Sequence, residues 1–295
     1  MSRSFEIVDV FTTRPLAGNQ LAVVTDAREL SAARMQAIAR EFNFAETSFL
    51  LPPADPANSA HVRIFTPAEE MPFAGHPNVG TAYVVARMGE LFGRPVADEL
   101  RFEEAAGLVA LEIERDGDAV TGARCRAPRP LAEGAEVPAA IVAELAGLDP
   151  ADILEERFAP RFASVGAEFL LAEVSAAALE RAAPDAGAFA RHNGRIGQTA
   201  GLLGLHLHVR DPNDSARLDA RMFAPLAGVA EDPATGSAAA ALGAFLHKRE
   251  PGLAGFALTQ GRHIGRPSEI MVELRDGAVW IGGPCAAFAH GELAE

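Results

Sequence analysis

Short segments rich in β-branched and other apolar residues recur along the chain, and each of them predicts a β-strand. The first two are 5–11 and 21–24, and the residues Pro15, Gly18 and Asn19 between them favour a turn. Similar segments follow at 46–51, 61–65, 108–114, 169–174, 203–209, 269–274 and 278–281. Strands are therefore expected over the whole length of the chain.

Longer segments carry apolar residues at helical spacing. In 31–42, Met35, Ile38 and Phe42 recur three or four positions apart, and Ser31 is well placed as the N-cap. Further helices are predicted at 77–89, 138–146, 176–183 and 237–247. The order of elements lacks the dense strand–helix–strand rhythm of a doubly wound parallel sheet, so that fold class is not expected.

The sequence also contains an internal repeat. Arg63-Ile-Phe-Thr-Pro67 recurs as Arg221-Met-Phe-Ala-Pro225, 158 positions further on. Each copy is followed by a glycine and a predicted helix, with Gly75 in the first copy and Gly236 in the second, 161 positions apart. The same order of features therefore occurs twice.

A third echo places Arg-Asp-Gly at 115–117 and again at 275–277. Three echoes at nearly one offset predict two copies of one α/β unit, unlike the many short units of a solenoid. Glycines and prolines cluster at 118–130, where the copies are expected to join. The expected domains are 1–120, completed by 284–295, and 121–283.

The glycines before the repeated helices indicate where a ligand could bind. Backbone N–H groups in the first turn of a helix lack partners within the helix, and the helix dipole is positive there, so carboxylates and phosphates bind well. One such turn can simply cap a helix. Two of them, at Gly75 and Gly236, predict an anion site in a cleft between the domains.

Charge narrows the possible partners. Lys and Arg number 26 against 40 Asp and Glu, a net charge of −14, so neither nucleic acid nor an anionic membrane surface is an expected partner. No uncharged segment reaches the roughly 20 apolar residues that span a bilayer. The N-terminal residues lack the apolar core of a signal peptide, so a cytoplasmic location is expected.

Cysteine and histidine positions give no metal site. Cys125 and Cys285 belong to no CxxC or CxxH motif, so neither a disulfide framework nor a structural zinc site is expected. His206 and His208 alternate on a predicted strand and share a face, a geometry compatible with a metal ion. No cysteine or acidic residue nearby completes a ligand set, so a structural or solvent-facing pair is favoured and no metal is predicted.

Four motifs resemble those of a known enzyme family. They are Pro15-Leu-Ala-Gly-Asn-Gln20, Phe44-Ala-Glu-Thr-Ser48, Gly75-His76-Pro77 and Glu231-Asp-Pro-Ala-Thr-Gly-Ser237, in this order along the chain. The pattern is similar to that of the PhzF-like isomerases of phenazine biosynthesis, which share the diaminopimelate epimerase fold. The resemblance implies an α+β fold of two pseudo-symmetric domains, each a mixed sheet curled around a central helix. It also implies an active site between the domains, a homodimer, and no metal or redox cofactor.

The resemblance assigns roles to individual residues. Glu46 matches the family's proton-transfer residue, and the apolar neighbours Phe42, Phe44 and Phe49 disfavour its charged form. Without the family, an exposed glutamate at a strand edge would be the simpler interpretation. The residues that the resemblance assigns to substrate binding are Gly75, His76, Asp232, Gly236 and Ser237.

The positions of the cysteines narrow the mechanism. Cysteine-dependent epimerases of this architecture use one thiol at each of the two helix ends. Here those positions hold Ala74-Gly75-His76 and Thr235-Gly236-Ser237, so racemisation by two thiols is not expected. A proton shift carried by Glu46 suits a conjugated substrate, and the reaction implied by the resemblance is isomerisation of trans-2,3-dihydro-3-hydroxyanthranilate, a small anion. Two alternatives remain, a cysteine-independent epimerase of an amino or hydroxy acid and a non-catalytic small-molecule-binding protein.

Overall fold

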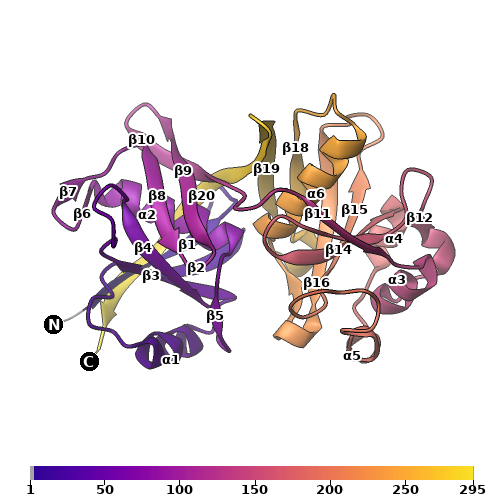
Figure 1. Cartoon of the computed structure of the whole chain (residues 1–295), viewed down its shortest axis with the longest axis horizontal. Helices are drawn as coiled ribbons and strands as arrows, with labels where there is room; N and C mark the ends of the chain where they lie inside the picture. The colour runs from indigo at the N-terminus through magenta and orange to yellow at the C-terminus, as the bar shows by residue number, and fades with distance from the viewer. Residues whose placement is uncertain (1–2, 295) are drawn as a thin grey trace. The chain divides into compact units, whose positions relative to one another are not determined.

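The computed structural model describes residues 3–294 of the chain, which fold into two compact units (Figure 1). Unit 1 comprises Met1–Pro128 and Trp280–Glu295, and unit 2 comprises Arg129–Val279. The sequence-based domains divide the chain at 120 and 283 instead. Residues 119–126 form one strand of unit 1, so the chain changes unit after this strand.

Unit 1 is built around a closed ring of strands. They are β1 (Arg3–Val10), β2 (Asn19–Val24), β3 (Glu46–Leu51), β4 (Ala60–Phe65), β8 (Glu99–Glu104), β9 (Gly107–Asp116), β10 (Ala119–Arg126) and β20 (Ala278–Leu293). Each strand pairs with the next in this order, and β20 pairs with β1 to close the ring. The pairs β2–β3 and β4–β8 are parallel and the others are antiparallel, so the sheet is mixed.

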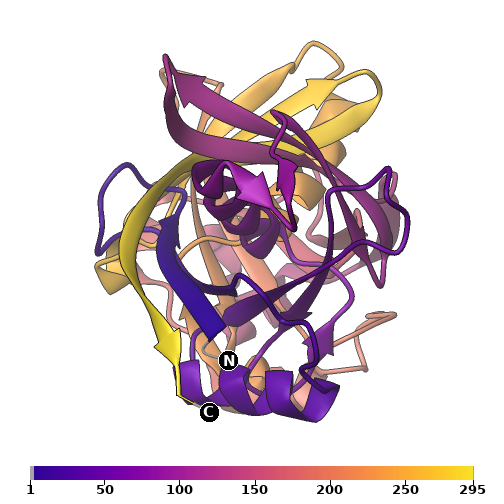
Figure 2. The ribbon, with the colours of Figure 1, turned by 90° about the vertical axis from the view of Figure 1, so that its left-hand side faces the viewer.

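The helix α2 (Gly75–Met88) lies inside this ring (Figure 2). Every residue from Gly75 to Ala86 is buried, as expected for a helix with sheet on all sides. Gly80 allows the close approach, because a Cβ atom there would lie 2.6 Å from Leu21 Cδ2 and 2.7 Å from Val10 Cγ2. The ring therefore holds the first turn of α2 in a fixed place.

A second helix, α1 (Ala32–Phe42), covers the outside of β3 and β4. The Ser31 side chain accepts a hydrogen bond from the backbone N–H of Arg34 at 3.2 Å, which confirms the predicted N-cap. Met35 of α1 packs with Phe49 of β3 and Phe65 of β4 in one hydrophobic cluster. The short strands β5 (Glu70–Met71), β6 (Glu90–Leu91) and β7 (Arg94–Pro95) complete the unit.

Unit 2 repeats the strand order of unit 1. Its strands are β11 (Ala132–Glu136), β12 (Ile153–Leu154), β13 (Arg161–Ser164), β14 (Glu168–Val174), β15 (Leu205–Arg210), β16 (Arg217–Ala224), β17 (Val229–Asp232), β18 (Gly255–Gln260) and β19 (Ser268–Arg275). Along β13–β14–β15–β16–β18–β19 the pairs are antiparallel, parallel, antiparallel, parallel and antiparallel. The strands β1–β2–β3–β4–β8–β9 show the same series of directions.

The helix α6 (Gly236–Arg249) occupies the place in unit 2 that α2 has in unit 1. It packs against β13, β14, β18 and β19, and both helices are 14 residues long. The opposite face of the unit 2 sheet is covered by α3 (Ala139–Ala146), α4 (Ala176–Arg181) and α5 (Ala186–His192) through a second hydrophobic cluster. The structure thus confirms the expected α+β fold of two similar units, each a mixed sheet around a central helix.

Candidate active site

Glu46 is the first residue of β3 and lies beside the start of α2. The chain reaches it directly after α1, which ends at Asn43 in the left-handed conformation, and the strand then pairs in parallel with β2 at Leu21. The carboxyl oxygen Oε2 of Glu46 lies 3.5 Å from Nδ1 of His76, the second residue of α2. The Glu46 side chain is 18% exposed and that of His76 only 5%. The oxygen Oε2 that faces His76 is itself buried, so a ligand can reach Glu46 only through the exposed part of its side chain.

His76 is a neutral imidazole at physiological pH. Burial lowers the pKa of His76 from 6.5 to about 3, although a hydrogen bond with the backbone of Gln20 acts in the opposite direction. Its contact with Glu46 is therefore not an ion pair. Among the described residues, Nε2 of His76 is buried and has no hydrogen-bond partner.

Asn19 approaches the same imidazole from the turn before β2. Its Nδ2 lies 3.4 Å from Nδ1 of His76, and the amide N–H can donate to Nδ1 in the tautomer in which Nδ1 carries no hydrogen. Gly18 makes this turn possible, since its φ is 65° and a Cβ atom there would lie 2.3 Å from the carbonyl oxygen of Val10. The turn that carries Asn19 to the site therefore requires a glycine.

The Glu46–His76 pair can hold a proton in two ways. When Nδ1 carries the hydrogen, the imidazole donates to a Glu46 carboxylate. When Nε2 carries the hydrogen, Nδ1 accepts from a protonated Glu46. At 3.5 Å the contact is longer than a normal hydrogen bond. A small approach of the two groups would let the neutral imidazole match the carboxyl in both protonation states, as a general acid/base that takes and returns one proton requires.

In unit 2, the residues that precede α6 form a compact hydrogen-bonded group. The hydroxyl of Thr235 donates to Oδ2 of Asp232. Nε2 of Gln260 donates to the carbonyl oxygen of Asp232 at 2.8 Å and to the Thr235 hydroxyl at 3.1 Å. Gly236 and Ser237 follow as the first two residues of α6, with Gly236 buried and Ser237 partly exposed. The first turn of α6 is therefore held firmly, with its N–H groups available to an anion.

An arginine braces the strand before this group. Arg221, from the repeated sequence motif, forms a bidentate ion pair with Glu231 at 3.0 and 2.6 Å, and both side chains are less than 10% exposed. It also donates to the carbonyl oxygens of Leu179 and Ala182. In unit 1, Arg63 pairs with Glu70 in the same bidentate way on β5.

The sequence identified most of these residues but not all of them. Within unit 1 the structure brings Glu46, His76 and Gly75 together, and within unit 2 it brings Asp232, Gly236 and Ser237 together. Asn19 and Thr235 stood inside the quoted motifs without an assigned role. Gln260 lies at the end of β18, and no local motif marks it, because its contact with Thr235 comes from the tertiary fold.

The other residues considered for chemistry are buried. Cys125 and Cys285 are free, and burial raises the pKa of both thiols, so they remain protonated at neutral pH. His206 and His208 are buried on β15, and desolvation lowers the pKa of His206 to about 4 and that of His208 well below 6.5. Their burial excludes the solvent-facing interpretation. Within 3–294, no cluster of three or more His, Cys, Asp or Glu side chains is arranged to hold a metal ion.

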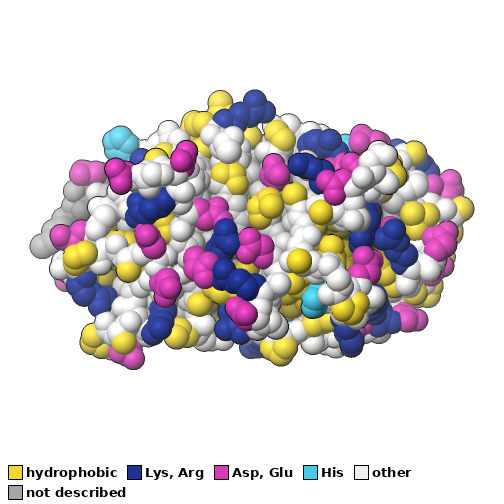
Figure 3. Space-filling model, turned by 90° about the horizontal axis from the view of Figure 1, so that it is seen from above, with side chains coloured by type: hydrophobic (Ala, Val, Ile, Leu, Met, Phe, Trp, Pro, Cys, Tyr) yellow, Lys and Arg dark blue, Asp and Glu magenta, His cyan; other side chains and the backbone are white. Residues whose placement is uncertain are grey.

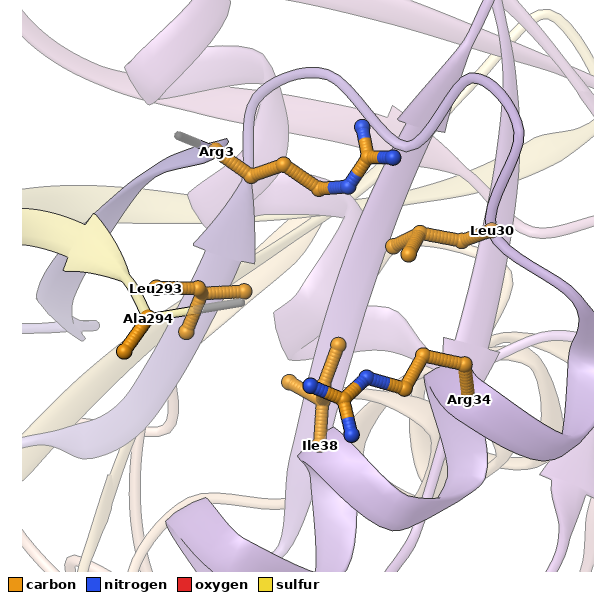
Figure 4. Close-up of a pocket in the computed structure, with 6 residues that line it drawn as sticks. All are labelled: Arg3, Leu30, Arg34, Ile38, Leu293 and Ala294. Atoms are coloured by element: carbon orange, nitrogen blue, oxygen red, sulfur yellow. The ribbon is translucent and has the colours of Figure 1, made fainter. Parts of the chain in front are cut away.

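A hollow in the surface lies away from these residues. It lies in unit 1, where the guanidinium groups of Arg3 and Arg34 flank an apolar floor (Figure 4); its lining residues are Arg3, Leu30, Arg34, Ile38, Leu293 and Ala294. No predicted site residue lines it. Acidic and basic side chains are interspersed over the face seen in Figure 3. Among the described residues, no helix is both long enough and apolar enough to cross a membrane.

Comparisons with known proteins show the family to which the chain belongs. The family model for phenazine biosynthesis-like proteins matches residues 8–291. An uncharacterized isomerase of Mesorhizobium japonicum is 40% identical over 304 residues, covering 99% of each chain. The trans-2,3-dihydro-3-hydroxyanthranilate isomerase of Pseudomonas aeruginosa is 36% identical over 296 residues, covering 97% of this chain and 98% of that protein. The solved structure of a predicted epimerase from P. aeruginosa is 36% identical, has a TM-score of 0.80 and covers 100% of both chains.

The fold and the relatives together define an isomerase with the diaminopimelate epimerase-like fold. Within that class, the chain belongs to the phenazine biosynthesis-like, or PhzF, family.

Proposed function

We propose that this protein is an isomerase that moves a proton within a small carboxylate substrate, trans-2,3-dihydro-3-hydroxyanthranilate or a close analogue. The single observation that carries the proposal is the carboxyl of Glu46, a partly exposed side chain, 3.5 Å from a buried, neutral His76 at the start of α2. The 36% identity to an enzyme of that name supports this choice of substrate.

Glu46 carries out the chemistry as a single acid/base. Its carboxylate removes a proton from one carbon, so that a C–H bond breaks and an O–H bond forms. The electron pair moves through the conjugated system, and the carboxyl group returns the proton to another carbon of the same substrate. Glu46 ends in its starting state, and the balance requires no oxidant, reductant or second substrate.

Substrate binding is assigned to the N-terminal turns of the two central helices. The N–H groups at Gly75 and Gly236 and the hydroxyl of Ser237 are donors of the kind that bind a carboxylate. Asp232, which already accepts from Thr235, orients a polar group of the substrate. A cytoplasmic homodimer, as the family resemblance implies, completes the proposal and is tested by size-exclusion chromatography with light scattering.

The decisive experiment compares the wild type with Glu46→Gln in heavy water. Glutamine keeps the shape of the side chain but cannot carry the proton, so we expect turnover to fall by about 10³-fold or more, within the range of general acid/base catalysis. Because the proton on the Glu46 carboxyl exchanges with solvent before it is returned to carbon, wild type should place solvent deuterium in the product. Glu41→Gln, at an exposed position of the neighbouring helix α1, is the matched control and should behave as wild type. Equal deuterium incorporation by Glu46→Gln and wild type would refute the assigned role.

The same measurement separates isomerisation from epimerisation, which the solved structure of a predicted epimerase at 36% identity keeps as a second candidate. An isomerase places the deuterium on a different carbon. An epimerase places the deuterium on the carbon that lost the proton and inverts the configuration of that carbon. Asp232→Asn should raise KM more than it lowers kcat, since Asp232 is assigned to binding and not to proton transfer.

A further inference from the structure

A second carboxyl group is buried inside unit 1, and the proposed reaction does not use it. Glu104 is the last residue of β8, and both of its carboxyl oxygens are buried without a hydrogen bond of normal geometry to the described residues. Leu100 and Phe102, at alternate positions of the same strand, are buried. Because alternate residues of a strand share a face, Glu104 points with them into the ring.

The side chain that Glu104 meets there is Asn78, in the first turn of α2. Nδ2 of Asn78 donates to the carbonyl oxygen of Ala74 at 3.0 Å, and the backbone N–H of Asn78 approaches the same oxygen at 3.4 Å. Ala74 is the N-cap residue of α2 and offers no capping side chain. Asn78 therefore braces the turn that begins with Gly75 and His76.

The oxygen Oδ1 of the Asn78 amide is a buried acceptor that receives no hydrogen bond from the described residues, 3–294. A buried acceptor without a donor is costly, and a protonated carboxyl beside it can supply the missing donor. The arrangement of Glu104 and Asn78 is therefore complementary when Glu104 is neutral.

Glu104 and Glu46 act on opposite sides of one helical turn. Two positions along an α-helix correspond to a rotation of about 200°, so His76 and Asn78 project in nearly opposite directions from α2. Glu46 faces His76, and Glu104 lies beside Asn78. The first turn of α2 is thus held between two carboxyl groups of unit 1.

The protonation state of Glu104 agrees with a donor role. Burial raises the pKa of this carboxyl to about 8, although the hydrogen bond with the Asn78 side chain acts in the opposite direction, so the carboxyl is neutral at pH 7. A titratable side chain that interacts with Glu104 is the buried thiol of Cys125 on β10, whose pKa is also raised by burial. From α2, the group that meets Glu104 is the amide of Asn78, which does not titrate.

We propose that Glu104 is a positioning residue which, through Asn78, holds the first turn of α2 so that His76 faces Glu46. This inference rests on the proposed function, because it concerns the geometry of the same proton-transfer pair. Ionisation of Glu104 removes the donor from Asn78 and places a negative charge in the core. The orientation of His76 is then expected to loosen.

Kinetics across pH test the proposal with three variants. Glu104→Gln keeps a neutral donor, so it should retain kcat/KM at pH 7 within about threefold and lose the decline that wild type shows above about pH 8. Glu104→Ala removes the donor and should lower kcat/KM by about 10- to 100-fold, mainly through kcat, because small misplacements of reacting groups are costly. Glu99→Gln, exposed at the other end of β8, is the matched control and should follow wild type. The same alkaline decline in wild type and Glu104→Gln would overturn the proposal even if Glu104→Ala fails to fold.

A measurement without substrate separates this inference from the proposed function. The ¹⁵N signals of the His76 ring, assigned with a His76→Gln variant, report its tautomer and environment. We expect them to change in Glu104→Ala and to stay unchanged in Glu104→Gln and Glu99→Gln at pH 7. Unchanged His76 signals in folded Glu104→Ala would refute the positioning role. Changed signals in a protein that turns over no candidate substrate would support the positioning role and count against the proposed function alone.

Discussion

Units 1 and 2 have the same series of strand directions but different chemistry beside their central helices. In unit 1, Phe65 pairs with Thr47, and in unit 2 its repeat counterpart Phe223 pairs with Leu205. The residue before Thr47 is Glu46, whereas the residue before Leu205 is Gly204. The candidate proton carrier therefore exists in one copy only.

What both units keep is the scaffold. Each has an Arg–Glu pair between neighbouring strands, a 14-residue central helix, and a glycine as the first residue of that helix. The difference teaches that strand register and helix placement survive duplication, while a few side chains at the helix start decide the chemistry. It also explains why one carboxyl group, and not a symmetric pair of groups, is assigned to proton transfer.

The largest expected contrast concerns the two Arg–Glu pairs. Arg221→Met leaves Glu231 buried without its partner, and breaking a buried pair costs about 3–5 kcal/mol of unfolding free energy. Arg63→Met removes a pair whose side chains are 22% and 37% exposed, and this should cost at most about 1 kcal/mol. Urea unfolding of both variants measures the difference. Equal losses of unfolding free energy in the two variants would show that burial does not make the Arg221–Glu231 pair more important than the Arg63–Glu70 pair.

A smaller contrast concerns pH. The folded pKa of His206 is about 4 against 6.5 for the free side chain. Between these values the unfolded chain binds a proton that the folded protein does not, so stability falls as the pH falls from 6.5 towards 4. Between pH 7 and pH 4.5, the free energy of unfolding should therefore fall by about 2 kcal/mol less in His206→Leu than in wild type.

Thermal unfolding of wild type and His206→Leu at several pH values measures this loss of stability at acidic pH. His290→Gln, at an exposed position, is the control and should keep the acid sensitivity of wild type. His76 is buried in unit 1 with its pKa lowered to about 3, so part of the acid sensitivity should remain in His206→Leu. An unchanged pH profile for His206→Leu would contradict the prediction.

The smallest expected effect tests how closely each central helix approaches its sheet. Gly80→Ala in α2 crowds Leu21 and Val10, and this outweighs the gain in helix propensity, for a net loss of about 1 kcal/mol. The position 161 residues later in α6 is the buried Ala241, and Ala241→Gly should lose about as much through backbone entropy. Stabilisation by Gly80→Ala in urea unfolding would show that the approach of α2 is not limiting.

Much of the fold could be predicted from apolar patterns. The helices expected at 31–42, 77–89, 138–146, 176–183 and 237–247 and all of the expected strands have counterparts in the structure. Several further strands and α5 were not predicted. One of the strands that were not predicted is β10, whose small and charged residues give no strand pattern. Its Arg124 forms an ion pair with Glu114 on the neighbouring strand β9. Such a strand gains its stability from partners far away in sequence, and a local pattern cannot show this.

The sequence by itself indicated that the chain contains two copies of one unit, that a glycine precedes a helix in each copy, and that Glu46 and His76 stand in motifs of one enzyme family. Local composition and spacing carry that information. Only the tertiary structure decided that His76 is neutral, that Gln260 holds Thr235, and that Glu104 lies beside Asn78. These properties depend on desolvation and on contacts between strands and helices far apart along the chain, which exist only once the ring of unit 1 and the sheet of unit 2 have formed.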